Sequence, residues 1–410
     1  MAKSKGKFSF NDIVGLTDGL IKKTSITRET EKTAQERGTV GTGIYVLNAA
    51  MCGDIYGGIP DNRITVLGGE SGVGKSFLCY NICRQAQEDG YSIIYIDTEF
   101  AIELDQLPNY GIDTSEDKFM LIRNNVIEDL KIFTTQLLDN LKEQKEAGKD
   151  IDKFLFIVDS VGQLGSRKEV EDAKSGKEKA DMTKAKALAS YFRIIGSDMS
   201  SLSIPMVCTN HTYKTLDLFP QDKMKGGNGL FYSASNIAFL TKAKLKNTAD
   251  MDDLDIGQSG LVVTAKMVKN RMVKPKKVKF EISFVSGCNP FIGLDYWCNG
   301  DNFEKVGVAK GKMVVDKSTG EEYFKEGGNR WYVRHLGKHI PKDSFFSAEV
   351  FNKGVLDALR PIIKETFEYK SVTELNEMQS RIEKAKGELD DDIEDATNIS
   401  TSDLFDEDED

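Results

Sequence analysis

The sequence contains no long hydrophobic run. No stretch of about 18 or more uncharged apolar residues occurs, so a helix that spans a membrane is excluded. The basic start at residues 1–7 is not followed by an apolar stretch of signal-peptide length. We therefore expect the protein to act in the cytoplasm of the cell that makes it, away from membranes.

Cysteine and histidine are also scarce, with six and three residues among 410. No two cysteines form a C-x-x-C pair, which excludes a zinc ribbon, and a reducing compartment disfavours disulfides. Cys79 and Cys83 lie four residues apart on a predicted helix and are interpreted as buried core thiols. His335 and His339 have the same spacing, but Gly337 between them weakens a helix and no third ligand is evident.

Acidic residues outnumber basic ones, 65 to 55, because of the end of the chain. Residues 388–410 contain 12 Asp and Glu and no Lys or Arg, and the remainder of the chain has a net charge of +2. A nearly neutral average can hide basic patches that face DNA phosphates. The acidic tail has almost nothing apolar to bury, so we expect it to be disordered.

The pattern divides the chain into four parts. Residues 1–35 contain a short helix whose apolar face is too small to fold alone, and we interpret them as an oligomerisation segment and linker. Residues 36–296 form the main core. Residues 297–387 are a smaller C-terminal region, rich in Lys, Gly and aromatics, and residues 388–410 are the tail.

Strands alternate with helices in the core, which predicts an α/β fold with a mainly parallel central sheet covered on both faces. The expected strands are residues 63–67, 92–97, 154–159 and 205–209. The expected helices are residues 76–89, 126–146 and 183–200. Successive strands follow at residues 237–240, 260–269 and 277–284, and we expect them to extend one edge of the sheet.

A phosphate-binding loop follows the first of these strands. Residues 69–76, G-E-S-G-V-G-K-S, match the P-loop pattern G-x-x-x-x-G-K-S in full. The glycines let backbone amides wrap the phosphates, Lys75 supplies a cation, and the Ser76 hydroxyl can bind Mg²⁺. The helix that follows directs its positive end at the same anion. The chain is therefore predicted to bind ATP with Mg²⁺.

Two carboxylates follow predicted strands of the core. Asp159 follows a fully apolar strand, which places it beside the metal. Glu99 ends the strand that we expect beside the P-loop strand, where it can orient or deprotonate the attacking water; a solvated strand-end acid is the alternative. The expected Mg²⁺ ligands are Ser76 and Asp159. The expected ATP-binding residues are Gly69, Glu70, Ser71, Gly72, Val73, Gly74, Lys75, Ser76, Phe77 and Asp159.

Taken in order, these segments resemble the RecA recombinase family, and within it the UvsX-type strand-exchange proteins of tailed phages. The resemblance covers roughly residues 40–290. It implies a RecA-type P-loop ATPase core at residues 36–296, acting in the host cytoplasm if the chain is phage-encoded. Besides the two ATP motifs, it is carried by residues 57–60 (GGIP), 95–99 (YIDTE), 158–161 (VDSV), 226–235 (GGNGLFYSAS) and 268–271 (VKNR).

The resemblance implies catalytic roles for Lys75, Glu99, His211, Lys269 and Arg271. His211 ends a strand at a position where many members have Gln. There it would sense whether a γ-phosphate is bound and transmit that signal to the DNA loops. The alternative is a histidine buried in the core. Lys269 and Arg271 would reach the neighbouring subunit's ATP; the alternative is two exposed residues on an edge strand. The adenine contact stays unassigned, because the segment after Glu99 lacks the family's Tyr.

Two basic segments follow the strands that end at Asp159 and near His211. As bare sequence each is typical of a solvated loop, but their positions match the family's DNA loops, residues 165–180 and 212–227. Lysines neutralise phosphates and an aromatic ring can wedge between bases. The expected DNA-binding residues are Arg167, Lys168, Lys177, Lys179, Tyr213, Lys214, Phe219, Lys223, Lys225, Gly226 and Gly227.

The resemblance implies an ATP-dependent recombination protein that forms a helical filament on single-stranded DNA and exchanges strands with a homologous duplex. Its ATPase would yield ADP or AMP, and its partners would include a single-stranded-DNA-binding protein and a mediator. The alternative is a hexameric RecA-fold helicase motor, which usually carries an N-terminal domain larger than residues 1–35. Intact Lys75, Asp159 and Glu99 argue against a non-catalytic DNA-binding protein.

Overall fold

The computed structural model describes residues 38–176, 183–215, 220–245 and 258–370, with residues 373, 376 and 380. The predicted N-terminal segment and acidic tail lie outside these residues. The chain up to Phe367 forms one compact unit, and Glu368 begins a second. Among the described helices none is long and apolar enough to cross a membrane. All six cysteines are free thiols, and Cys79 and Cys83 are buried as expected.

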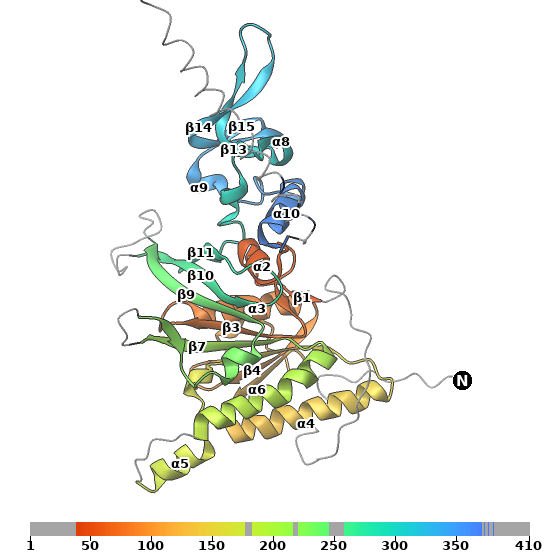
Figure 1. Cartoon of the computed structure of the whole chain (residues 1–410), viewed down its shortest axis with the longest axis vertical. Coiled ribbons are helices and arrows are strands. Elements are labelled where there is room, and N and C mark those ends of the chain that lie inside the picture. The colour runs from red at the N-terminus through yellow and green to blue at the C-terminus, as the bar shows by residue number, and fades with distance from the viewer. Residues whose placement is uncertain are drawn as a thin grey trace, which may run out of the picture. The chain divides into compact units, whose positions relative to one another are not determined.

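A ten-stranded sheet forms the core of the first unit, in the order β12-β11-β10-β9-β3-β7-β6-β4-β5, with β8 attached to β7. Figure 1 shows β11, β10, β9, β3, β7 and β4 of this sheet in that order from top to bottom. The strands from β9 to β5 along this order are parallel, and the pairs from β9 to β12 are antiparallel. The mainly parallel sheet with strands added at one edge is therefore confirmed. The parallel strands are β3 (Ile64–Gly69), β4 (Tyr91–Asp97), β5 (Phe119–Arg123), β6 (Lys153–Asp159) and β7 (Met206–Lys214). The added strands are β9 (Asn236–Leu245), β10 (Gly260–Asn270), β11 (Lys277–Ser283) and β12 (Gly287–Cys288).

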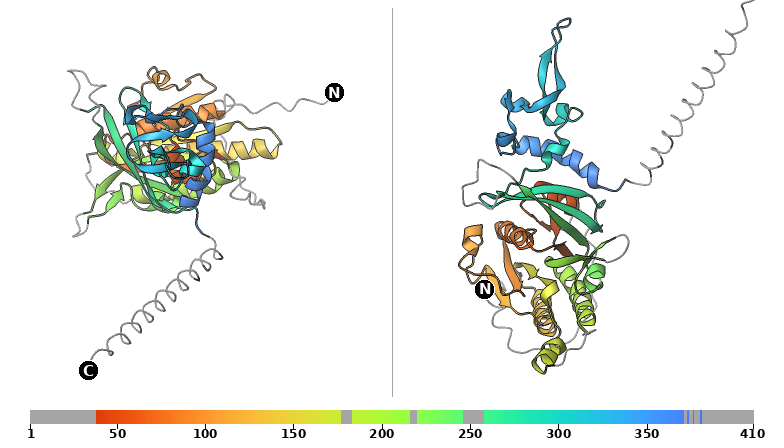
Figure 2. Two further views of the ribbon diagram at one scale, coloured as in Figure 1. Left: turned by 90° about the horizontal axis from the view of Figure 1, so that it is seen from above. Right: turned by 90° about the vertical axis from the view of Figure 1, so that its left-hand side faces the viewer.

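Helices cover both faces of this sheet because its central strands are apolar on both sides. Along β4, Ile93 and Tyr95 join one hydrophobic cluster, whereas Ile94 and Ile96 join the other. The first cluster includes α2 (Tyr45–Cys52) and α3 (Lys75–Glu88), and the second includes α4 (Ile127–Glu146) and α6 (Thr183–Leu202). Figure 2 shows α4 and α6 at the opposite end of the first unit from the C-terminal strands.

The strand order corrects one prediction. β4 does not lie beside the P-loop strand β3, because β7 and β6 separate them. Successive parallel strands are joined by crossovers that can leave space between them, so neighbours in sequence need not be neighbours in the sheet. β6 and β7 fill that space, and their carboxyl ends consequently lie between those of β3 and β4.

The C-terminal region is built on a second sheet of three antiparallel strands. Trp331 stacks on Phe345 with ring centroids 4.0 Å apart, and both belong to the hydrophobic cluster that also contains Val46 of the core. Arg360 donates to both carboxylate oxygens of Asp54 at 2.9 and 3.0 Å, which ties the last helix to the loop after α2. The elements are β13 (Val308–Val315), β14 (Glu322–Val333), β15 (Lys338–Ile340), α8 (Phe303–Val306), α9 (Lys342–Phe345) and α10 (Lys353–Phe367).

Short elements complete the unit. A two-stranded pair, β1 (Thr39–Val40) and β2 (Ile59–Pro60), precedes β3. The remaining elements are α5 (Arg167–Lys174), α7 (Gly229–Ser233), β8 (Asp222–Met224), and the 3-10 turns η2 (Leu107–Tyr110), η3 (Val161–Gln163), η5 (Leu294–Trp297) and η6 (Arg334–Leu336).

Candidate nucleotide and DNA sites

The P-loop lies between the end of β3 at Gly69 and the start of α3 at Lys75. Gly72 and Gly74 have φ angles of +69° and +93°, in the left-handed region that favours glycine. The Lys75 ammonium folds over the loop and donates to the carbonyls of Gly69 and Glu70 at 3.0 and 2.9 Å. Burial lowers the pKa of Lys75, and the nearby carboxylates of Asp159 and Glu99 oppose that shift. The Lys75 ammonium therefore lies close to both the P-loop and the carboxylates of Asp159 and Glu99.

Asp159, at the end of β6, is held by a strand on each side. The Tyr95 hydroxyl of β4 donates to Asp159 Oδ2 at 2.9 Å, and the Thr209 hydroxyl of β7 donates to Oδ1. Burial raises the pKa of Tyr95 well above its usual value, so the phenol keeps the proton that it donates. The sequence analysis missed both residues. Tyr95 opens the segment at residues 95–99 that carries the family resemblance, but nothing in the sequence marks either hydroxyl as a partner of Asp159.

Glu99 lies just past β4, in a turn that a buried carboxylate stabilises. Asp97 accepts hydrogen bonds from the backbone amides of Glu99 at 3.1 Å and of Ile102 at 3.0 Å. The Ser160 hydroxyl donates to Glu99 Oε1 at 2.8 Å, so the residue after Asp159 fixes the Glu99 carboxylate. Thr98 and Ser160 also exchange hydrogen bonds, at 2.7 and 2.8 Å. These contacts join the ends of β4 and β6.

His211 connects this carboxylate to the P-loop strand. In the register of β7 on β3, His211 lies opposite Gly69. Its Nε2 atom is 3.3 Å from Glu99 Oε1, and its side chain is 18% exposed against 37% for Glu99. Asp159, Glu99 and His211 thus come together from β6, β4 and β7 with Lys75 at the start of α3, at the carboxyl edge of the sheet, where ligands bind in open α/β folds.

The second predicted DNA segment is a β-hairpin rather than a loop. β7 continues to Lys214 and pairs with β8, with Tyr213 opposite Lys223. The Lys225 amide donates to the His211 carbonyl at 3.0 Å, so the hairpin is continuous with the strand that carries His211. Sequence reasoning ended the strand too early because its polar, exposed half lacks the apolar residues that mark a core strand. Tyr213, Lys214, Lys223 and Lys225 are exposed, Gly226 and Gly227 have φ of +88° and +80°, and Phe219 lies outside the described residues.

The first predicted DNA segment contains a helix, α5, over Arg167–Lys174. Charges of opposite sign at helical spacing stabilise helical turns, whereas the sequence prediction for this segment was a loop. The Arg167 guanidinium forms an ion pair with Asp129 of α4, which partly neutralises this candidate DNA contact. Lys168 is exposed, whereas Lys177 and Lys179 lie outside the described residues.

Lys269 and Arg271, at the end of β10, contact α7 rather than the P-loop. Lys269 Nζ donates to the carbonyls of Phe231 at 2.6 Å and Tyr232 at 3.1 Å, and Arg271 Nη2 donates to the Tyr232 carbonyl at 3.2 Å. Because β10 is flanked by β9 and β11, it is an interior strand, not the edge strand of the alternative interpretation. Burial is the main cause that lowers the pKa of Lys269, and the positive charge of Arg271 lowers it further.

A cavity of about 660 Å³ lies beside the first two turns of α3. Phe77 and Tyr80 of α3 line it together with Tyr110, the last residue of η2. The Tyr110 ring centroid lies 5.0 Å from that of Tyr80 and 5.8 Å from that of Phe77. Phe284, just after β11, lines another part and is 56% exposed. Sequence reasoning missed Tyr110 and Phe284, because only the fold brings them next to the P-loop helix.

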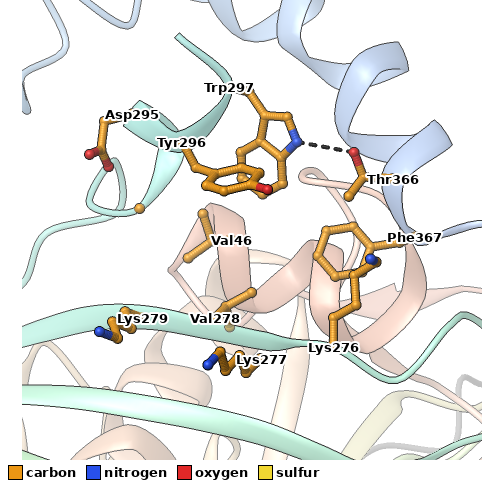
Figure 3. A pocket seen from close by; sticks show the side chains of 11 residues that line it. Val46, Lys276, Lys277, Val278, Lys279, Asp295, Tyr296, Trp297, Thr366 and Phe367 are labelled. Carbon is orange, nitrogen blue, oxygen red and sulfur yellow. Dashed lines mark hydrogen bonds between the residues drawn. The ribbon is translucent and has the colours of Figure 1, made fainter. Parts of the chain in front are cut away.

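A second cavity, of about 510 Å³, lies where α2 and β11 meet the C-terminal region (Figure 3). Trp297 donates from Nε1 to the Thr366 hydroxyl at 3.0 Å along one wall, and Val46 and Val278 form the floor. Lys277 and Lys279 line the strand side. None of the predicted site residues lines this cavity, so it is separate from the nucleotide site.

Comparison with known proteins identifies the family. The family profile of the RecA N-terminal domain matches residues 12–289. The chain belongs to the RecA family. This agrees with the recombinase resemblance and does not favour the helicase alternative, which rested on the shared ATPase core alone.

Among RecA-family relatives, the recombination and repair protein of Enterobacteria phage T4 is 30% identical over 262 residues, 63% of each chain. This chain thus spans a little under two thirds of that protein. Protein RecA of Nautilia profundicola is 25% identical over 317 residues, 74% of this chain and 83% of the relative. Protein RecA of a Sulfurovum species is 27% identical over 297 residues, 70% and 77% of the two chains.

Proposed function

We propose that this RecA-family protein is an ATP-dependent recombination and repair protein. It forms filaments on single-stranded DNA, pairs them with a homologous duplex and exchanges strands. The contact between His211 and Glu99 carries this proposal. His211 lies opposite the P-loop strand and touches Glu99, and its own strand continues into the basic hairpin. One strand thus connects a candidate hydrolytic carboxylate to a candidate DNA contact.

In this proposal Glu99 orients and deprotonates the water that attacks the γ-phosphate. Ser160 holds Glu99 Oε1 at 2.8 Å, and Asp97 fixes the backbone that carries it. A carboxylate held by neighbouring groups needs little reorganisation when it acts as a base. Lys75 neutralises the β- and γ-phosphates once its ammonium leaves the Gly69 and Glu70 carbonyls.

Ser76 and Asp159 would hold Mg²⁺ with the phosphates. A hydroxyl and a carboxylate are oxygen donors of the kind that Mg²⁺ prefers, and this ion usually needs few protein ligands because it keeps several waters. When bound, it neutralises the charge that develops on the phosphoryl oxygens. Tyr95 and Thr209 orient Asp159 for this purpose.

The cavity beside α3 would hold the adenosine end of ATP. It begins one residue after Ser76, at Phe77, and its size of about 660 Å³ is in the ordinary range for a small ligand. Tyr110 and Phe284 present aromatic surface on which a purine can stack. In this proposal, these rings supply the adenine contact that the sequence left open.

Lys269 and Arg271 would complete the site of a neighbouring subunit. In the single chain their donors are bound to α7 carbonyls, close to the end of the second DNA segment. Assembly on DNA would free them to reach the adjacent γ-phosphate, where cations stabilise the transferring group. A single-stranded-DNA-binding protein and a recombination mediator would assist this assembly, and hydrolysis would yield ADP, with AMP as a further product.

The proposal is tested by ATP turnover of the full chain with and without single-stranded DNA. DNA should increase turnover of the parent protein. Lys75→Ala should lower turnover by about 100-fold or more, since loss of a transition-state cation costs several kcal/mol. Product chromatography in the same reactions separates ADP from AMP. Parental turnover in Lys75→Ala, or no response to DNA, would contradict the proposal.

A further inference from the structure

Lys242, on β9, contacts the P-loop at Ser71 and Gly72. Its ammonium donates to the carbonyl of Gly72 at 3.0 Å and to that of Ser71 at 3.3 Å. A Cβ atom built on Gly72 would lie 3.1 Å from Lys242 Nζ, so the ammonium lies close above this turn. Neither the P-loop motif nor the predicted site residues include Lys242.

The sheet places this lysine there. β9 pairs in parallel with β3, and Leu240 lies opposite Gly69 at the last position of the P-loop strand. Lys242 is two residues further along, so its side chain starts beyond the end of β3, level with the loop. In the other direction β9 pairs with β10, where Lys242 lies opposite Val263. The backbone of Lys242 is therefore fixed by pairing with β10, while its side chain reaches the loop.

The two carbonyls that Lys242 binds belong to peptide groups of the phosphate-binding loop. The Ser71 carbonyl shares a peptide group with the Gly72 amide, and the Gly72 carbonyl shares one with the Val73 amide. A cation at the oxygen end of a peptide group polarises it and strengthens its N–H as a donor. P-loop amides bind phosphate by this donor end. Lys242 is thus positioned to strengthen phosphate binding by the loop amides, from the carbonyl side of the loop.

We propose that Lys242 is a positioning residue for the nucleotide, which holds the Ser71–Gly72–Val73 turn in its phosphate-binding form and polarises its amides. The proposal rests on the proposed function of the P-loop as the ATP site. Two features of the structure are explained together: an exposed lysine with both contacts on loop carbonyls, and a glycine at the place where its ammonium lies. Lys242 is also near enough to Lys75 for its charge to lower the pKa of that lysine.

Lys244 provides a matched control. It lies two residues along β9, so its side chain leaves the same face of the strand, and it is exposed like Lys242. Replacing either lysine by alanine removes one positive charge from the same strand. Only Lys242 has hydrogen bonds to the P-loop among the described contacts of these two residues.

The experiment measures the Kd of the full-length protein for a fluorescent N-methylanthraniloyl derivative of ATP, with Mg²⁺ and without DNA. Lys242→Ala should raise the Kd about 10-fold, as expected for loss of hydrogen bonds from a charged donor, and Lys242→Arg should restore part of the affinity. Lys244→Ala should stay within about 2-fold of the parent, because a charge without the contact is screened. Lys75→Ala serves as the reference for a disrupted site.

Each outcome decides the proposal. A parental Kd for Lys242→Ala, with weak binding by Lys75→Ala, would overturn the role of Lys242 and leave the ATP site intact. Equal losses in Lys242→Ala and Lys244→Ala would also overturn it, since they would show a general charge effect. Failure of the parent protein to bind the probe would instead overturn the proposed function, and this inference with it.

Discussion

At the residue scale, the candidate catalytic groups are held by side chains that were not among the predicted site residues. Tyr95 and Thr209 occupy both oxygens of Asp159, and Ser160 binds Glu99. Asp97 is 1% exposed and bonds only to backbone amides among its described contacts, so its carboxylate shapes the turn rather than the chemistry. Restraint of this kind lowers the cost of reaching a reactive geometry.

His211 gives the sharpest residue-scale prediction. His211→Ala should keep ATP binding but reduce DNA-stimulated turnover about 10- to 100-fold, because it removes a donor to the Glu99 carboxylate. His211→Gln should retain most of the stimulation, since an amide NH₂ can donate in place of the imidazole. Turnover is measured over a range of single-stranded DNA concentrations.

Nucleotide affinity measured in parallel is the control for these variants. Full stimulation in His211→Ala would show that His211 is a structural residue of β7. Equal loss in the alanine and glutamine variants would show that the imidazole itself is required.

At the scale of elements, the order of most core strands and helices followed from the sequence, but α2, β5 and the arrangement of the strands did not. Alternating apolar strands and amphipathic helices predicted the parallel sheet and its added strands. The neighbours of β3 could not be predicted, because crossover lengths allow several strand orders. The Tyr110 side of the cavity beside α3 was also missed, because only the tertiary fold brings η2 to α3.

The two candidate DNA segments were predicted by position but not by conformation. Both contain charged residues, whose local preferences are weak when no apolar face fixes their period. In the structure, Tyr213 pairs with Lys223 in the β7–β8 hairpin, and Arg167, the first residue of α5, forms an ion pair with Asp129.

The contact of Lys269 and Arg271 with α7 predicts a defect that a partner subunit can repair. Lys269→Ala and Arg271→Ala should each abolish DNA-stimulated turnover and leave the Kd for nucleotide within about 2-fold, because the proposed function places these cations at another subunit's phosphate. Mixing either variant with Lys75→Ala should restore part of the turnover. Each mixed pair of subunits can contain one intact interface.

Turnover is measured at several mixing ratios, with co-assembly checked by light scattering. If the variants co-assemble and no ratio restores turnover, the two cations do not complete a neighbouring site. Recovery that is independent of ratio would also contradict a shared interface.

At the scale of the whole molecule, charge is divided unevenly along the chain. Deleting residues 388–410 changes the net charge from −10 to +2. The truncated protein should bind duplex DNA more tightly, because 12 carboxylates that repel DNA and compete with it are removed. The difference should be largest at low salt and shrink once the Debye length falls to about 8–10 Å.

The prediction is checked by measuring the affinity of the full-length and truncated proteins for duplex DNA across a salt series. Equal affinities at every salt concentration would leave the tail as a solubilising or partner-docking segment, with Leu404 and Phe405 as its apolar residues.

The most direct test of the account is electron microscopy of the full-length protein with single-stranded DNA, Mg²⁺ and a slowly hydrolysed ATP analogue. We predict continuous helical filaments that need both DNA and nucleotide, and only short or irregular complexes with Lys75→Ala. Closed rings, or small complexes of the same form with and without nucleotide, would contradict an ATP-dependent recombination filament.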